Sequence, residues 1–218
     1  MKIAVLGSGA WGTALSLLLQ KNGHEVTLWS YCEEECSALR ERGENKMLPG
    51  VPLPEGLPLT HREDVVAGCG LVVFAPPSYA MRQTALRVKP YLMPEAVLVT
   101  VAKGVEPESG LRMSEILAET LPGHPIAALS GPSHAEEVAR EMPTGCVAAC
   151  ADRAVAEWLQ GIFMNPSFRV YSSTDITGVE LCGAAKNIIA LAAGMAEGMG
   201  CGDNAKALMM SRARVELS

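Results

Sequence analysis

Three glycines near the N-terminus have the spacing of a phosphate-binding turn. Gly7, Gly9 and Gly12 follow the apolar run 2–6 and precede a segment rich in alanine and leucine, so the pattern reads strand, G-x-G-x-x-G, helix. In such a turn the first glycine allows a tight reversal, the second lets the backbone approach a pyrophosphate, and the third lets helix and strand pack closely. The helix N-terminus attracts the phosphates. The pattern therefore predicts a dinucleotide site.

The second expected strand, residues 25–29, ends without the acid that usually binds the ribose 2′-hydroxyl. Ser30 and Tyr31 occupy its end. The glutamates at 33–35 come slightly late, where they could equally begin a solvated helix. No arginine or lysine lies between residues 21 and 40 to bind a 2′-phosphate. The choice between NAD and NADP stays open, and NADP is not expected to be strongly excluded.

Two lysines stand where they could transfer a proton or bind an anion. Lys103 directly follows the expected strand 96–101, at the sheet edge that also holds the glycine turn; the alternative is an ordinary loop lysine. Lys186 lies in an apolar helical segment with no carboxylate one turn away. A buried ammonium there would be costly. Lys186 therefore either extends to water or acts as an acid/base.

Strand and helix signals alternate along most of the chain, which predicts an α/β fold: a Rossmann-type doubly wound, mostly parallel sheet. From Gly178 strand alternation stops and the composition favours helix. We therefore expect a dinucleotide-binding domain over 1–177, followed over 178–218 by the first helices of an incomplete all-α substrate domain. The helix after Gly178 is apolar on nearly every face, which predicts that it is buried. The expected strands are 2–6, 25–29, 71–75, 96–101, 126–129, 145–149 and 168–171, and the expected helices include 33–42, 64–67, 79–88, 110–121 and 151–163.

Composition excludes several classes of protein. With 49% apolar residues in 218, the chain can bury a core, and a net charge of −6 argues against a nucleic-acid surface. The longest apolar stretch, 188–196, is short for a membrane span, so no membrane insertion is expected. The seven cysteines have no supporting ligands at metal spacing, so we expect no metal site, reduced thiols and a cytoplasmic location.

Several blocks together closely resemble the bacterial-type NAD(P)-dependent glycerol-3-phosphate dehydrogenases. The matching blocks occur in the family's order and cover nearly the whole chain: GSGAWGTALS, NKMLPGVPLP, APPS, AKGVE, LSGPSHAEEVA with PTG after it, and VELCGAAKNIIALAAGMAEGMGCGDNAKALMMSR. The resemblance implies an oxidoreductase that interconverts dihydroxyacetone phosphate and sn-glycerol 3-phosphate with NAD or NADP. Such an enzyme feeds glycerophospholipid synthesis.

The resemblance also implies residue roles. Lys186 would be the catalytic proton donor and acceptor, and would also contact substrate. Lys103 would contact both cofactor and substrate, and Gly131 and Ser133 would line the glycerol-phosphate pocket. The cofactor would be bound by Gly7, Gly9, Ala10, Trp11, Gly12, Tyr31 and Ala135.

The family's pattern continues beyond this chain, and with it an Asp and an adjacent Arg-Asn pair that hold substrate phosphate and cofactor. The chain is therefore expected to be truncated, with very low turnover by itself. Two other interpretations remain: another two-domain NAD(P)-dependent dehydrogenase acting on a hydroxy acid or sugar acid, or a non-catalytic dinucleotide-binding module. A homodimer also stays an open alternative.

Overall fold

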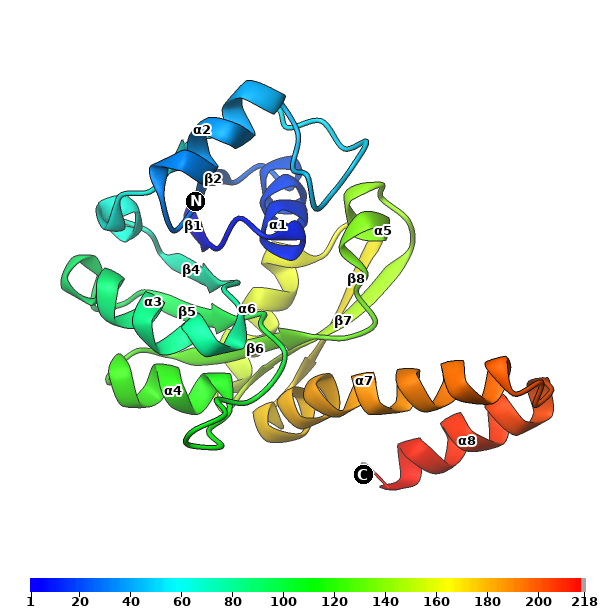
Figure 1. Ribbon diagram of the computed structural model, residues 1–218. Helices are drawn as coiled ribbons and strands as arrows, with labels where there is room; N and C mark the ends of the chain where they lie inside the picture. Colours follow the sequence, from blue (N-terminus) through cyan, green and yellow to red (C-terminus); the bar gives the residue numbers. More distant parts are fainter. Residues whose placement is uncertain (217–218) are drawn as a thin grey trace.

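A single eight-stranded sheet organises the chain (Figure 1). The computed structural model describes residues 1–216. The strand order is β3-β2-β1-β4-β5-β6-β7-β8, and every neighbouring pair is parallel except β6 with β7. The strands are β1 Lys2–Leu6, β2 Glu25–Trp29, β3 Leu59–Thr60, β4 Leu71–Phe74, β5 Val97–Thr100, β6 Ile126–Ser130, β7 Thr144–Cys150 and β8 Phe168–Ser173.

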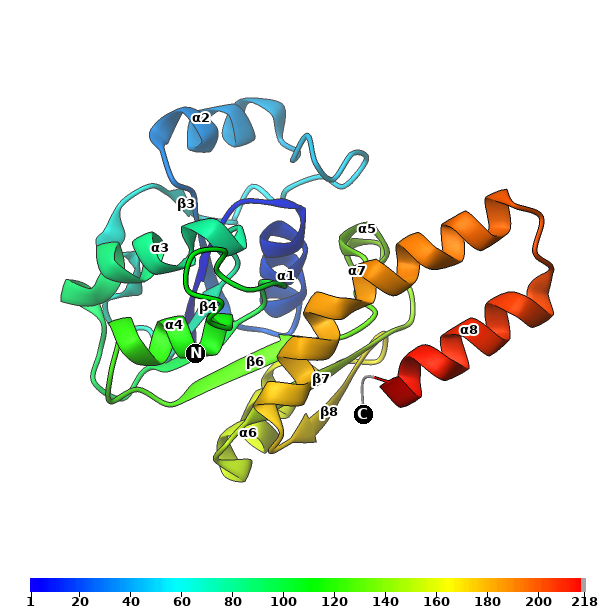
Figure 2. The ribbon, with the colours of Figure 1, turned by 60° about the horizontal axis from the view of Figure 1, so that its bottom comes forward.

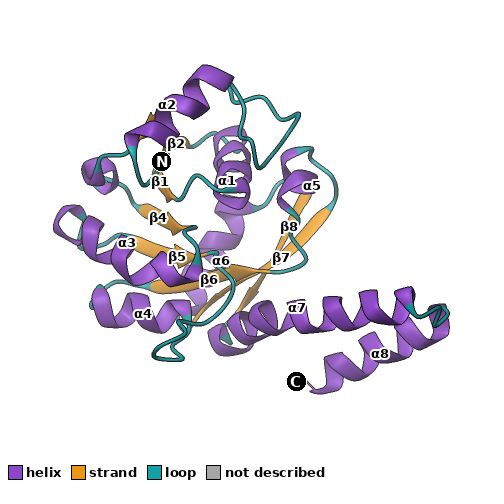
Figure 3. Ribbon diagram, in the orientation of Figure 1, coloured by secondary structure: helices purple, strands orange, loops and turns teal. Residues whose placement is uncertain are grey.

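Helices cover both faces of the sheet (Figure 3). One core lies between the strands and α1, α5 and α6; the other lies between the strands and α3 and α4. The α-helices are α1 Ala10–Lys21, α2 Glu33–Arg42, α3 Met81–Val88, α4 Met113–Thr120, α5 Ala135–Ala139, α6 Arg153–Phe163, α7 Ile176–Gly198 and α8 Asp203–Glu216, with short 3₁₀ turns at Glu63–Val66, Ser78–Ala80 and Lys89–Tyr91.

The doubly wound, mostly parallel sheet expected from the sequence is confirmed. The structure adds two short elements that the sequence analysis did not identify, β3 and α5. It also shows that β7 runs antiparallel to β6 while β8 runs parallel to β7. Strands of two and helices of five residues carry too few periodic positions to be recognised from a pattern.

The prediction that the helix after Gly178 is buried is wrong for most of its length. In α7 the buried residues are Glu180 and Gly183, near the N-terminal end, where the helix contacts β6 and β7. Beyond that point α7 and α8 form a hairpin that projects from the sheet (Figure 2). Apolar composition predicts burial only where another element lies opposite, and the element that lies beside this part of α7 is α8 (Figure 2). Of the expected second segment, residues 217 and 218 lie outside the described residues.

By length and composition alone α7 could cross a membrane, with 23 residues and a mean hydropathy of 1.4 in its most apolar window. The apolar stretch 188–196, expected to be too short for a membrane span, is bounded in the sequence by Asn187 and Glu197. The structure shows one continuous helix. Its N-terminal end is tied to the sheet domain by the carboxylate of Glu180, which is hydrogen-bonded to Arg112 and Ser114. A buried polar contact of this kind is typical of a helix that packs within a folded domain.

Candidate functional site

The three glycines of the turn between β1 and α1 meet different surroundings. Gly7 has a φ of +126°, and a Cβ there would lie 2.6 Å from the carbonyl oxygen of Ala75. A Cβ on Gly12 would lie 1.9 Å from the carbonyl oxygen of Gly7, so α1 could not pack against the turn. A Cβ on Gly9 would meet no protein atom within 4 Å. Gly7 and Gly12 are therefore required by the fold, whereas Gly9 leaves space for a ligand.

A buried asparagine that the sequence analysis did not assign supports this turn. Asn45 donates hydrogen bonds to the carbonyl oxygen of Ser8 at 2.8 Å and to the hydroxyl of Thr13 at 2.7 Å. Its own side-chain oxygen accepts from the backbone N–H of Met47 at 2.9 Å. Asn45 is only 1% exposed, so these bonds are shielded from water. They join the loop after α2 to the glycine turn. Asn45 is the first residue of the NKMLPGVPLP block, which was the only feature of the sequence that pointed to this residue.

A cleft of about 760 Å³ opens over the carboxyl ends of β1, β2, β4 and β5. Of the expected site residues, eight line it: Gly7, Gly9, Ala10, Trp11, Gly12, Tyr31, Lys103 and Ser133. The segment after β4, residues 75–80, also lines it, and so do Ser8 and Glu35. Its size suits a cofactor-sized ligand, and its position is where open α/β sheets bind dinucleotides. The free backbone at Gly9 and the N-terminus of α1 fit a pyrophosphate there.

Lys103 stands at the end of this cleft away from α2. Its ammonium Nζ donates to the hydroxyl of Ser133 at 3.2 Å and lies 6.0 Å from the centre of the Trp11 ring. Burial lowers the pKa of Lys103, and the positive charge of Lys186 lowers it further. The helix that bears Lys186 passes beside Lys103, since a Cβ on Gly183, one turn before Lys186, would lie 3.8 Å from Cγ of Lys103. Lys103 brings positive charge to this end of the cleft, while Lys186 lies outside the residues that line it.

Lys186 is exposed, which corrects the expectation of a lysine on a buried helix. Its helix nevertheless approaches the sheet closely one turn earlier. A Cβ on Gly183 would lie 2.5 Å from the Ser130 hydroxyl oxygen and 3.8 Å from Cγ of Lys103. At the next turn back, Glu180 accepts hydrogen bonds from the guanidinium of Arg112 at 2.7 Å and from the backbone N–H of Ser114 at 2.8 Å. These contacts fix where α7 leaves the sheet and so where Lys186 stands.

Three expected site residues, Gly131, Ala135 and Lys186, do not line the cleft. Gly131 packs against β7, because a Cβ there would lie 2.6 Å from the carbonyl oxygen of Gly145. Its carbonyl oxygen accepts a hydrogen bond from Ser133 at 3.2 Å. Ala135 begins α5 and is packed against the core. Within residues 1–216 there is no cluster of three or more His, Cys, Asp or Glu side chains that could hold a metal ion.

A sheet of this topology, with a glycine turn, an open cleft above it and Lys103 at one end, defines a Rossmann-type dinucleotide-binding protein. The N-terminal model of the NAD-dependent glycerol-3-phosphate dehydrogenases matches residues 2–156, and the C-terminal model of the same family matches residues 175–218. The chain therefore belongs to the glycerol-3-phosphate dehydrogenase family, as the resemblance predicted.

Relatives and solved structures agree with this assignment. The chain is 52% identical to the glycerol-3-phosphate dehydrogenase [NAD(P)+] of Moorella thermoacetica, over 99% of this chain and 65% of that protein. It is 47% identical to the corresponding protein of Desulfitobacterium hafniense, over 100% of this chain and 62% of that one. The crystal structure of glycerol-3-phosphate dehydrogenase from Coxiella burnetii superposes with a TM-score of 0.89 at 35% identity, over 99% of this chain and 66% of that chain. The chain thus spans somewhat less than two thirds of the length of these relatives.

Proposed function

We propose that this chain forms the dinucleotide-binding part and the proton-transfer lysine of an enzyme that interconverts dihydroxyacetone phosphate and sn-glycerol 3-phosphate with NAD(P)H. One observation carries the proposal. In a chain of this family, the cleft above the glycine turn ends at Lys103, beside which α7 holds Lys186. In this proposal residues 1–177 bind the cofactor, and residues 178–218 begin the domain that encloses the substrate.

The cofactor supplies a hydride to C2 of the ketone, and the residues of this chain do the rest. Lys186 donates a proton to the alkoxide oxygen that develops at C2 and takes it back in the reverse reaction, a role worth about 10²–10⁴ in rate. Lys103 and Ser133, hydrogen-bonded to each other, lie where they can hold substrate, and Gly131 shapes the loop that presents Ser133. Positive charge from the two lysines stabilises the developing negative charge.

The cofactor itself is held by the cleft residues already described. Gly7, Gly9 and Gly12 present the backbone to the pyrophosphate, while Ala10 and Trp11 begin the helix that faces it. The roles of Tyr31, on the cleft wall, and Ala135, at the start of α5, rest on the family resemblance.

The setting of the reaction is also a proposal. The product would feed glycerophospholipid synthesis, and the enzyme would act in the cytoplasm on small soluble phosphates. Four cysteines are buried without a disulfide, namely Cys36, Cys69, Cys146 and Cys150. Reduced thiols of this kind are typical of that compartment.

An assay of NADH oxidation tests the activity. The chain, and the chain extended by the last third of the Moorella thermoacetica relative, are each given dihydroxyacetone phosphate, a 2-keto acid or a 3-keto acid. We expect the extended chain to reduce dihydroxyacetone phosphate selectively. Reduction of a keto acid instead would favour another dehydrogenase, and NADH binding with no reduction of any substrate would favour a non-catalytic module.

Substitution of the lysine tests the mechanism. Lys186→Ala in the extended chain should lower kcat by about 10²-fold or more while leaving NADH affinity nearly unchanged, because the group acts mainly in the transition state. Lys89→Ala, which removes an exposed lysine after α3, is the matched control and should not change kcat. Equal kcat for Lys186→Ala and the parent would show that another group transfers the proton.

A further inference from the structure

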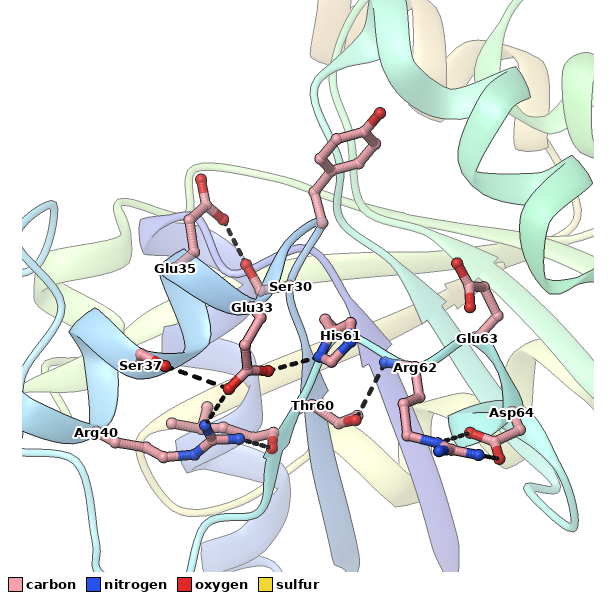
Figure 4. A network of polar contacts seen from close by, with 12 residues as sticks. Ser30, Glu33, Glu35, Ser37, Arg40, Thr60, His61, Arg62, Glu63 and Asp64 are labelled. Atoms are coloured by element: carbon pink, nitrogen blue, oxygen red, sulfur yellow. Dashed lines mark hydrogen bonds and ion pairs between the residues drawn. The ribbon is translucent and has the colours of Figure 1, made fainter.

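A carboxylate from the first turn of α2 reaches the end of β2, where the sequence itself has no acid. Ser30, directly after β2, is 1% exposed, and its hydroxyl donates a hydrogen bond to Oε2 of Glu35 (Figure 4). Ser8, inside the glycine turn, donates to the same oxygen at 3.2 Å, and the two serine hydroxyls lie 2.7 Å apart. Glu35 is thus bound to both segments that surround a ribose in this fold, the glycine turn and the end of the second strand.

Of the three successive glutamates, only Glu35 lines the cleft. Glu33 turns toward Arg40 and His61 instead, accepting from Arg40 at 2.9 Å (Figure 4). Glu34 is exposed and lines none of the cavities described above. A helical turn places successive side chains about 100° apart, which explains why one glutamate faces the cleft and its neighbours do not. The sequence showed three late acids without showing which of them reaches the site.

The cations near Glu35 are either paired with another acid or lie outside the cleft. Arg87 stacks on the rings of Tyr31 and Trp29 but is paired with Glu63, its Nε donating to that carboxylate at 2.9 Å. An adjoining cavity of about 110 Å³ is lined by two cations and two acids: Arg42, Lys46, Glu35 and Glu44. Among the described residues, no cation forms an ion pair with Glu35 itself. The charge that a ribose would meet on this wall is therefore the carboxylate.

We propose that Glu35 accepts hydrogen bonds from the adenine-ribose hydroxyls and makes this chain select NAD(H) over NADP(H). The inference rests on the proposed function, since it places the cofactor in the same cleft. Both serine hydroxyls donate to Oε2, which leaves Oε1 to accept from the ribose diol. A 2′-phosphate would bring two negative charges against this carboxylate, whereas Arg42 and Lys46 line the adjoining cavity and not the cleft. The expectation that NADP is not strongly excluded is thereby narrowed to a preference for NAD.

Calorimetric titration of the chain with NADH and with NADPH tests this assignment. At low ionic strength we expect NADH to bind at least about tenfold more tightly than NADPH, because the Glu35 carboxylate repels the 2′-phosphate. High salt should screen this repulsion and bring the two dissociation constants closer together. Glu35→Gln keeps a hydrogen-bonding side chain and removes the charge. It should bring the two dissociation constants to within about threefold of each other, mainly by tightening NADPH.

Glu34→Gln is the matched control, because it removes the same charge one residue away from the cleft wall. It should leave the ratio of the two dissociation constants unchanged. The role of Glu35 would be overturned if the parent bound NADH and NADPH equally or bound NADPH more tightly, or if Glu35→Gln left the ratio unchanged. None of these results would contradict the assignment of the cleft as the dinucleotide site. Failure to bind either dinucleotide would overturn the proposed cofactor site itself, and this inference with it. The ratio of the two dissociation constants in the parent tests the proposal even if a variant fails to fold.

Discussion

At the scale of single residues, the glycine turn separates the requirements of folding from those of binding. Gly7 and Gly12 have no room for a side chain. A Cβ on Gly7 would overlap backbone atoms of Ala75, and a Cβ on Gly12 would overlap the carbonyl group of Gly7. Gly9 has room within the protein, so what restricts it is the ligand. The same motif therefore contains two kinds of glycine, and substitutions should distinguish them.

Gly9→Val should lose most NADH affinity, by about tenfold or more, because the added methyl groups stand where the pyrophosphate approaches the backbone. Its thermal unfolding should stay close to that of the parent. Gly12→Val is the contrasting variant and should fail to fold stably, since its Cβ would meet the carbonyl oxygen of Gly7. Calorimetry with NADH and a thermal melt measure the two effects. Unchanged NADH affinity in a folded Gly9→Val would refute the phosphate-cradle interpretation.

At the scale of elements, the orientation of α7 depends on a small buried contact. Glu180 is 7% exposed and holds Arg112 and Ser114, which begin α4, while Gly183 lets the helix approach Ser130 at the end of β6. Arg112 also pairs with Glu115 at 2.8 Å, so the guanidinium is held on both sides. The contact joins the sheet domain to the helix that bears Lys186, and it sets the distance between Lys186 and Lys103.

Glu180→Ala should loosen α7 from the sheet, because it leaves the guanidinium of Arg112 and the N–H of Ser114 without this partner. Breaking a buried pair in this way costs about 3–5 kcal/mol. Backbone hydrogen exchange should accelerate in the first half of α7 and change little in β1 and β4. Glu197→Ala, at an exposed position in the same helix, should leave exchange there unchanged. Equal protection of α7 in Glu180→Ala and the parent would show that other contacts hold the helix.

At the scale of the whole molecule, the α7–α8 hairpin projects from the sheet domain (Figure 1) and exposes several large apolar side chains. Along α7 and at its C-terminal end, four residues recur at helical spacing and are 59–80% exposed: Ile188, Leu191, Met195 and Met199. Leu208 and Met210 add to these side chains from α8. A contiguous apolar surface of this kind promotes association. Association is therefore expected to occur through the hairpin.

We expect concentration-dependent self-association of the chain, measured by sedimentation. Leu191→Lys should weaken it about tenfold or more, the effect of losing one well-buried leucine from the contact. Leu86→Lys changes a 52% exposed leucine on α3, away from the hairpin, and should have no effect. A monomer at every concentration, or equal weakening by both variants, would argue against association through the hairpin.

Local sequence determined the parts of this protein whose signals are short in range. The run 2–6, the glycine spacing and the apolar stretches ending near Phe74 and Thr100 each specify a strand or turn by themselves. The α/β fold, the glycine turn and the placement of Lys103 at the cleft followed from them. The family resemblance carried more: it pointed to Lys186, which residue types alone left undecided between two roles.

Tertiary structure decided the features that depend on what lies opposite a residue. The antiparallel run of β7 and the exposure of α7 are properties of neighbours, which an apolar pattern does not contain. Asn45 became part of the site because its loop returns to the glycine turn, 37 residues away in sequence. Glu35 was one of three equivalent acids until the first turn of α2 aimed it at Ser8 and Ser30. Hydrogen bonds between distant segments act over a few ångströms of space, so no spacing along the chain could reveal them.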